Sequence, residues 1–171
     1  TSLGLGSGRL RLQWGVRVIV ATTTLEEDDG IALEASRYGA PAVRGAAADV
    51  LSRYVLAADV FGLRSIVRAT ADNPAVDMGA PRRTLELLER TGAGHVVEHG
   101  LPYGCAVEAI SVEALRHANE CATQDYDREH VTPLLKRDRR YGPLDALAPS
   151  DVRRSELRLT VDTHEDLDFV R

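Results

Sequence analysis

The sequence predicts an α/β protein with a mostly parallel central sheet. Short β-branched, apolar runs alternate along the chain with longer segments whose apolar residues recur at helical spacing. Glycines and prolines separate the two kinds of segment, as expected for helix stops and turns. The 171 residues suit a single domain over the whole chain, because a chain of this length buries roughly 70% of its unfolded surface.

Several short segments carry a strand pattern. The run VRVIVAT is the strongest, because it is β-branched and apolar and ends in a polar threonine run. The predicted strands and extended pieces are 16–22, 41–44, 66–67, 95–98, 105–110 and 157–161. In the last of them, Leu157, Leu159 and Val161 alternate onto one face.

Helices are predicted from apolar periodicity and from capping residues. The predicted helices are 31–38 after Asp28 or Asp29, 49–61 after Asp49, 81–90, and one that begins after Ser111. Thr163 and Asp166 resemble an acidic capping box before a last helix. Pro133 breaks the segment 125–136 into short helices, and 141–150 is predicted to be a surface connection.

Composition excludes several function classes. The formal net charge of −5 does not suggest a nucleic-acid partner, and no apolar run approaches membrane-spanning length. Cys105 and Cys121 form no CxxC pair, so we expect reduced cysteines in a cytoplasmic protein. The five histidines lack the HExxH spacing that is typical of zinc sites.

Asp72 is the first candidate functional residue. It follows the apolar pair Ile66 and Val67 and precedes Pro74, which cannot donate to a sheet ladder. Its carboxylate is therefore expected just beyond the carboxyl end of an inner strand, where ligands bind in open α/β sheets. There it can coordinate Mg²⁺. Taken alone, the pattern fits an Asx turn better.

Asp162 matches Asp72, because it also follows a predicted strand and precedes a helix start. Two carboxylates at one sheet edge repel each other unless a cation joins them, which favours a shared Mg²⁺. Such an ion would stabilise charge during phosphoryl-type transfer. The alternative, Asp162 as a helix N-cap, explains the pattern equally well.

Several blocks of sequence carry a family resemblance from about residue 16 to the end of the chain. They are VIVATT, DDGI, VRG, DVLSRY, IVRATADNPAVD, LPYGCAVEAIS, DREHVTPLLK and LRLTVDTHEDLDFVR. Together they resemble the cytidylyltransferases of bacterial surface-polysaccharide synthesis, in the spore-coat branch related to acylneuraminate and Kdo cytidylyltransferases. The resemblance implies a Rossmann-like nucleotidyltransferase fold of three layers. It also implies that CMP passes from CTP to a sugar acid or related small acceptor, with release of pyrophosphate.

The resemblance also implies roles for individual residues. Asp72 and Asp162 would hold Mg²⁺ on the triphosphate, with Arg68 beside them at the catalytic centre. The expected nucleotide-binding residues are Gly6, Ser7, Arg9, Ala21, Thr22 and Arg44. The expected substrate contacts are Glu108, Glu129 and His130, although an ion pair with Arg128 would explain the last two equally well.

The N-terminal segment departs from the family pattern. The family has a strand, a loop resembling GSTRLPGK and a helix ahead of VIVATT, whereas only GSGRL at 6–10 resembles that loop here. We therefore expect residues 1–15 to be irregular or truncated. Loss of one donor to the transferring group costs on the order of a hundredfold in rate, so reduced activity is expected. The missing helix would also bare one face of the sheet, which favours a homodimer or low stability.

Two other function classes are compatible with the sequence. The incomplete N-terminal loop fits a catalytically silent domain that binds a nucleotide or a partner protein. A glycosyltransferase that uses a nucleotide sugar would need a DxD motif, and 125–127 and 166–168 have that spacing. Neither DxD motif follows a predicted strand directly.

Overall fold

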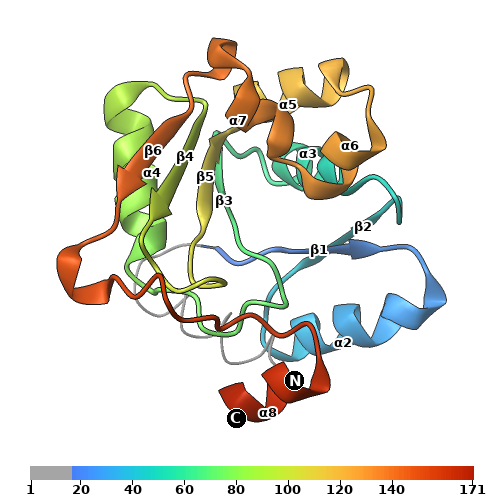
Figure 1. Cartoon of the computed structure of the whole chain (residues 1–171). Helices are drawn as coiled ribbons and strands as arrows, with labels where there is room; N and C mark the ends of the chain where they lie inside the picture. Colours follow the sequence, from blue (N-terminus) through green and yellow to red (C-terminus); the bar gives the residue numbers. More distant parts are fainter. Residues whose placement is uncertain (1–16) are drawn as a thin grey trace.

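The computed structural model describes residues 17–171, which form an α/β structure with two sheets (Figure 1). The strands are β1 (Val20–Thr23), β2 (Ala42–Gly45), β3 (Ser65–Arg68), β4 (His95–His99), β5 (Glu108–Ser111) and β6 (Leu144–Leu147). The α-helices are α2 (Asp29–Arg37), α3 (Val50–Val60), α4 (Ala80–Thr91), α5 (Val112–Cys121), α6 (Asp125–His130), α7 (Pro133–Arg137) and α8 (His164–Val170). Short 3₁₀ helices are η1 (Glu26–Asp28), η2 (Arg139–Tyr141) and η3 (Ser150–Val152).

Most strands run in the same direction within each sheet. β1 and β2 form a parallel pair, and the larger sheet has the order β3-β5-β4-β6. β6 is parallel to β4, whereas β5 is antiparallel to both β3 and β4. Three of the four strands of the larger sheet therefore point the same way, which confirms the predicted mostly parallel α/β fold.

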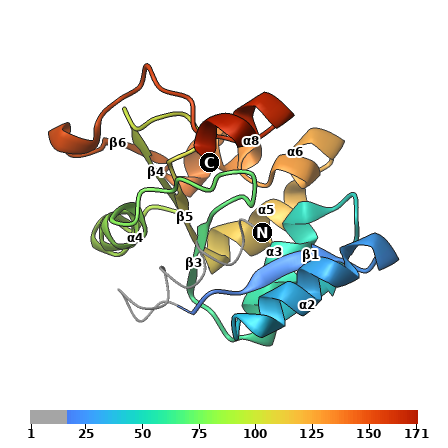
Figure 2. The same cartoon turned by 90° about the horizontal axis from the view of Figure 1, so that it is seen from below.

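Different helices cover the two faces of the larger sheet (Figure 2). On β5, Ala109 packs with Val96 and with Leu88 of α4. The next residue, Ile110, packs with Leu115 of α5 and Leu51 of α3. Successive strand residues point to opposite faces, so α4 forms one outer layer and α3 with α5 forms the other.

Side-chain capping fixes several helix starts that the sequence predicts. The Asp49 carboxylate accepts from the Ser52 N–H at 3.0 Å at the start of α3. The Ser111 hydroxyl accepts from the Ala114 N–H at 3.1 Å at the start of α5. Thr163 caps α8 in a capping box with Asp166, as predicted.

Two predictions about the C-terminal third are wrong. The supposed surface connection at 141–150 contains β6, a short edge strand whose residues are alternately half-buried and exposed. Its four residues are too few to show a clear strand pattern. The segment 157–161 is not a strand, because it pairs only through an isolated bridge between Tyr103 and Arg158. Thr160 is 3% exposed there, whereas Leu157 is 42% exposed, so the predicted apolar face is not the buried one.

Two sequence features concern cysteines and membranes. Cys105 is buried and Cys121 is exposed, and both are free thiols, in agreement with the predicted lack of a disulfide framework. Among the helices of residues 17–171, none combines the length and the apolar character that crossing a bilayer requires.

The capping of α5 can be tested by Ser111→Ala. Loss of the cap should lower the free energy of unfolding by about 1 kcal/mol, measured by urea denaturation. Ser36→Ala, at an exposed position near the end of α2, serves as the control and should change it by less than about 0.5 kcal/mol. Equal effects of the two substitutions would contradict the capping role.

Candidate functional site

One edge of the larger sheet gathers three loops. The carboxyl ends of β3, β4 and β6 lie there, together with the first residue of the antiparallel strand β5. The loops are 69–79, 100–107 and 148–163, and we call this region the loop edge. Figure 1 shows the last of them, in orange to red, running below the strand ends. Because ligands bind at the carboxyl ends of strands in such sheets, the loop edge is the candidate site.

The loop edge brings the segments of Asp72 and Asp162 together. The Val161 N–H donates to the Asp72 carbonyl at 2.8 Å, and the Thr160 hydroxyl donates to the same oxygen at 3.3 Å. Asp72 is an exposed residue. The Asp162 carboxylate accepts a hydrogen bond from Arg158. Two positions far apart in sequence thus lie on adjoining backbone segments.

The N-cap explanation of Asp162 is wrong. The residue that caps α8 is Thr163, whose hydroxyl accepts from the Asp166 N–H. The Asp166 carboxylate in turn accepts the backbone N–H groups of Asp162 and Thr163, at 3.0 and 2.9 Å. The carboxylate of Asp162 is therefore not used to start the helix.

Gly104 allows the three loops to meet closely. Its φ of +93° lies in the region that favours glycine. A Cβ atom there would lie 2.8 Å from the Thr160 backbone nitrogen and 2.9 Å from the Asn73 side-chain oxygen. Any larger residue would push the 148–163 loop away from the loop that carries Asp72.

A cluster of polar side chains centred on the buried Glu108 lies beside the loop edge. Arg68 and Glu108 are directly opposed across β3 and β5, and the Arg68 Nη1 donates to Glu108 Oε2 at 2.8 Å. The Glu108 Oε1 lies 2.6 Å from Lys136 Nζ, 3.1 Å from the Thr132 hydroxyl and 3.3 Å from His95 Nε2. Glu108 is only 7% exposed. We call these five residues the Glu108 cluster.

The cluster keeps Glu108 ionised. Burial by itself raises the pKa of Glu108, but the hydrogen bond from His95 and the positive charges of Arg68 and Lys136 outweigh it. The pKa of this carboxyl therefore falls well below its usual range. Burial also raises the pKa of the Tyr54 hydroxyl on α3, and the nearby guanidinium of Arg68 opposes that shift.

Other predicted substrate residues lie apart from this cluster. Glu129 and His130 are exposed on α6, and the His130 ring lies against Tyr126 with ring centroids 4.4 Å apart. The alternative explanation for Glu129 was an ion pair with Arg128. Arg128 instead pairs with Asp49, at 2.8 Å. The neighbouring residues that do reach Glu108 are Thr132 and Lys136, on the next helix.

The predicted nucleotide-binding residues around β1 are placed as follows. Ala21 and Thr22 lie in β1, and Thr22 is buried. The Arg44 guanidinium donates to the carbonyl oxygens of Thr23 and Leu25 at 2.7 and 2.8 Å, and it pairs with Asp29 at 2.6 Å. Arg44 therefore holds the turn after β1. The predicted residues Gly6, Ser7 and Arg9 lie outside the described range.

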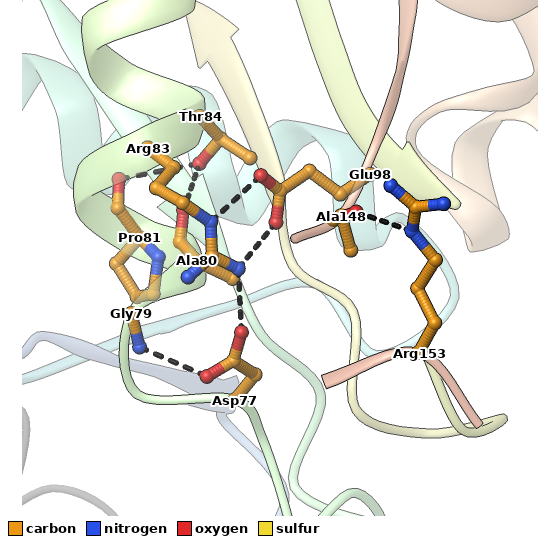
Figure 3. A network of polar contacts seen from close by, with 9 residues as sticks. All are labelled: Asp77, Gly79, Ala80, Pro81, Arg83, Thr84, Glu98, Ala148 and Arg153. Atoms are coloured by element: carbon orange, nitrogen blue, oxygen red, sulfur yellow. Dashed lines mark hydrogen bonds and ion pairs between the residues drawn. The ribbon is translucent and has the colours of Figure 1, made fainter. Parts of the chain in front are cut away.

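A second network supports the loop edge from the side of α4 (Figure 3). Arg83 binds Glu98 through two hydrogen bonds of 2.8 and 2.6 Å, and it binds Asp77 at 2.5 Å. The other oxygen of Asp77 accepts the Gly79 N–H at 3.1 Å. The backbone N–H of Asp77 donates to the Cys105 carbonyl at 2.9 Å. The network thus joins α4, the end of β4 and two of the three loops.

A shallow hollow lies at the opposite end of the strands. It is formed around the last residue of β5, and its lining includes Gly92, Ser111, His117, Arg140 and Tyr141. The candidate carboxylates and the Glu108 cluster take no part in it. The candidate site at the loop edge is therefore separate from this hollow.

Sequence reasoning missed His95, Thr132 and Lys136 as parts of the site. His95 opens a strand and Thr132 precedes Pro133, so local pattern gives neither a special role. Composition does contain a signal for the third, since Lys136 is the only lysine of the chain.

Comparison with known proteins identifies the family. The cytidylyltransferase family model matches residues 10–171. The chain belongs to the cytidylyltransferase family. It is 28% identical to the cytidylyltransferase of Leptospira borgpetersenii, whose structure superposes with a TM-score of 0.88 over 98% of this chain and 72% of the other.

Two relatives of the chain are longer than it is. An uncharacterised protein of Methanocaldococcus jannaschii is 32% identical over 150 residues, which are 87% of this chain and 62% of the relative. The spore coat polysaccharide biosynthesis protein SpsF of Bacillus subtilis is 27% identical over 156 residues, which are 90% and 65% of the two chains. The chain thus spans less than two thirds of each.

A more distant structure shows the same fold. CMP:2-keto-3-deoxy-manno-octonic acid synthetase, solved with CTP, superposes with a TM-score of 0.65 over 99% of this chain and 85% of the other, at 10% identity. This likeness supports the Rossmann-like nucleotidyltransferase fold that the sequence predicts.

Removal of the Glu108 charge should destabilise the fold in a pH-dependent way. In Glu108→Gln, the charges of Arg68 and Lys136 lose their buried partner, which should cost about 3 kcal/mol of unfolding free energy near pH 7. Because the pKa is lowered by folding, the unfolded state binds more protons below the ordinary value of 4.5. The difference between wild type and variant should therefore shrink there, by up to about 1.4 kcal/mol per pH unit.

Urea denaturation at a series of pH values measures this difference. Glu89→Gln, at an exposed position on α4, is the control and should stay within about 0.5 kcal/mol of wild type. A difference between wild type and Glu108→Gln that does not change with pH would show that Glu108 is not held ionised by its neighbours.

Proposed function

We propose that the chain carries the catalytic centre of a CTP-dependent cytidylyltransferase whose acceptor is a sugar acid or a related small molecule. The main support is the contact of the Asp72 carbonyl with the Val161 N–H and the Thr160 hydroxyl, which brings the segments of the two candidate carboxylates together at the loop edge. Family membership and the fold shared with a synthetase solved with CTP agree with this proposal. Surface-polysaccharide synthesis is the expected pathway, by likeness to SpsF.

The proposed reaction is a nucleotidyl transfer. A hydroxyl oxygen of the acceptor attacks the α-phosphorus of CTP and loses its proton to solvent or to a nearby base. The bond between the α-phosphorus and the oxygen that bridges to the β-phosphate breaks, and pyrophosphate leaves with that electron pair. The products are the CMP derivative of the acceptor and pyrophosphate. Most of the catalytic demand is for positioning and charge stabilisation.

Asp72 and Asp162 have the chemistry to hold Mg²⁺. This ion usually takes one or two carboxylates, with water and substrate phosphates in its other positions. Asp162 would exchange its hydrogen bond from Arg158 for the metal. When bound, Mg²⁺ would offset charge on the triphosphate.

The protein's own charges would assist nucleotide binding. The Glu108 cluster contains two fixed positive charges, on Arg68 and Lys136, against one negative charge on Glu108. One positive charge is left over near the loop edge, where an anionic substrate would gain from it. Arg68 is held by Glu108 and so would act mainly as fixed positive charge.

The glycosyltransferase alternative lacks a free DxD motif. Asp127 is buried, and both of its oxygens bind Arg137 at 2.5 Å. Asp166 is occupied by the capping box of α8. Both motifs therefore have structural roles in this fold.

A homodimer, which the sequence predicts, stays a prediction.

The metal assignment can be tested by Asp72→Asn and Asp162→Asn. Each should lower kcat/KM for Mg²⁺-dependent pyrophosphate release from CTP by at least about a hundredfold, because the charge on the triphosphate would lose its counter-ion. A panel of sugar acids supplies the acceptor, and a coupled pyrophosphate assay gives the rate.

Asp168→Asn, at an exposed position on α8, is the matched control and should keep wild-type activity. Wild-type rates in the two test variants would exclude the metal assignment. Binding of CTP by calorimetry without turnover on any acceptor would support a nucleotide-binding domain instead of an enzyme.

A further inference from the structure

The choice of lysine at position 136 stands out in this chain. Of its 21 lysine and arginine residues, 20 are arginine and one is Lys136. Lysine and arginine differ chemically, because lysine presents a compact ammonium with three rotatable donors and arginine presents a rigid planar fork. A chain that uses arginine at every other basic position has its one ammonium side chain on the buried Glu108.

A strained turn places Lys136 there. Val131 has a φ of +70°, which is rare for a β-branched residue, and the Thr132 N–H donates to the His130 carbonyl at 2.8 Å across it. Val131 is fully buried, so core packing holds this γ-turn in place. The turn starts α7 such that Thr132 and Lys136, one helical turn apart, both reach Glu108.

The three charged side chains of the Glu108 cluster differ in how far they are exposed to solvent. The side chains of Glu108 and Arg68 are 9% and 19% exposed, whereas that of Lys136 is 49% exposed. Within residues 17–171, Glu108 is the only acidic side chain paired with Lys136. The Lys136 ammonium therefore has one donor turned toward Glu108 and further donors available on its solvent side.

We propose that Lys136 is a substrate-binding residue whose ammonium binds an anionic oxygen group, and that Glu108 is the positioning residue that aims it. This inference rests on the proposed function, and it names the kind of substrate group that this part of the site recognises. The oxygen group belongs either to the carboxylate of the acceptor or to a phosphate of CTP. Both fit an excess positive charge that is open to solvent on one side.

The single lysine makes the direct test simple. Protein grown with ¹³C-labelled lysine carries one labelled side chain, and its NMR signal reports Lys136 alone. CTP, 3-deoxy-manno-octulosonate and cytidine are titrated separately, with backbone amide signals followed in parallel. We expect the neutral cytidine to leave the Lys136 signal in place and one of the two anions to shift it saturably. The anion that shifts it identifies the source of the oxygen group.

The outcomes separate this inference from the proposed function. If CTP shifts backbone amides but neither anion shifts the Lys136 signal, the role of Lys136 is wrong while the proposed function stands. If CTP shifts no signal at all, the proposed function fails. If the sugar acid also leaves the Lys136 signal unchanged, the inference on Lys136 fails together with the proposed function.

Variants distinguish a binding role from a structural one. Lys136→Gln removes the ammonium, so KM for the anionic substrate should rise at least tenfold. Lys136→Arg keeps a positive charge that can both pair with Glu108 and bind an anion, so its thermal midpoint and KM should lie closer to wild type. Arg139→Gln, which removes a charge from an exposed position on η2, is the control and should leave KM unchanged. A Lys136→Gln variant with a lowered thermal midpoint and a wild-type KM would indicate a purely structural ion pair.

Discussion

The buried ion pair between Arg68 and Glu108 is the constraint on which much of this structure depends. The two residues are directly opposed at the last position of β3 and the first of β5, and their side chains are 19% and 9% exposed, so little water reaches them. Burying such a pair costs more than the attraction returns unless further hydrogen bonds satisfy the carboxylate. His95 on β4, together with Thr132 and Lys136 from the start and body of α7, supplies those bonds. The ion pair and its partners thereby fix how β3, β4, β5 and α7 pack.

The loop edge depends on this rigid base and on close backbone contact. The Arg83 network holds α4 and the end of β4 on one side (Figure 3). The Glu108 cluster holds the other side. Between them, Gly104 lets the loops of Asp72 and Asp162 touch through backbone hydrogen bonds. A site for a flexible triphosphate can thus be built on loops, because the strands beneath them are held by buried charge pairs.

Local chemistry made most of the fold predictable, and long-range contacts made part of the site unpredictable. The caps Asp49 and Ser111 mark helix starts through bonds to residues three positions away, so sequence alone reveals them. The place of Asp72 beyond β3 follows from a general rule about strand ends, whereas Asp162 follows a loop and its meeting with the Asp72 segment is a non-local contact. The partners of Glu108 come from β3, β4 and α7, and no local pattern joins them. The edge strand β6 was missed because its pairing with β4 is also non-local.

The central claim is that the nucleotide and its metal bind at the loop edge. Paramagnetic relaxation by Mn²⁺ in the presence of CTP tests it most directly, because broadening of amide signals falls steeply with distance from the ion. We expect the amides of Asn73 and Thr163 to broaden strongly, and those of Gly92 and His117 at the opposite end of the strands to stay sharp. Broadening at Gly92 and His117 with sharp signals at Asn73 and Thr163 would contradict the account.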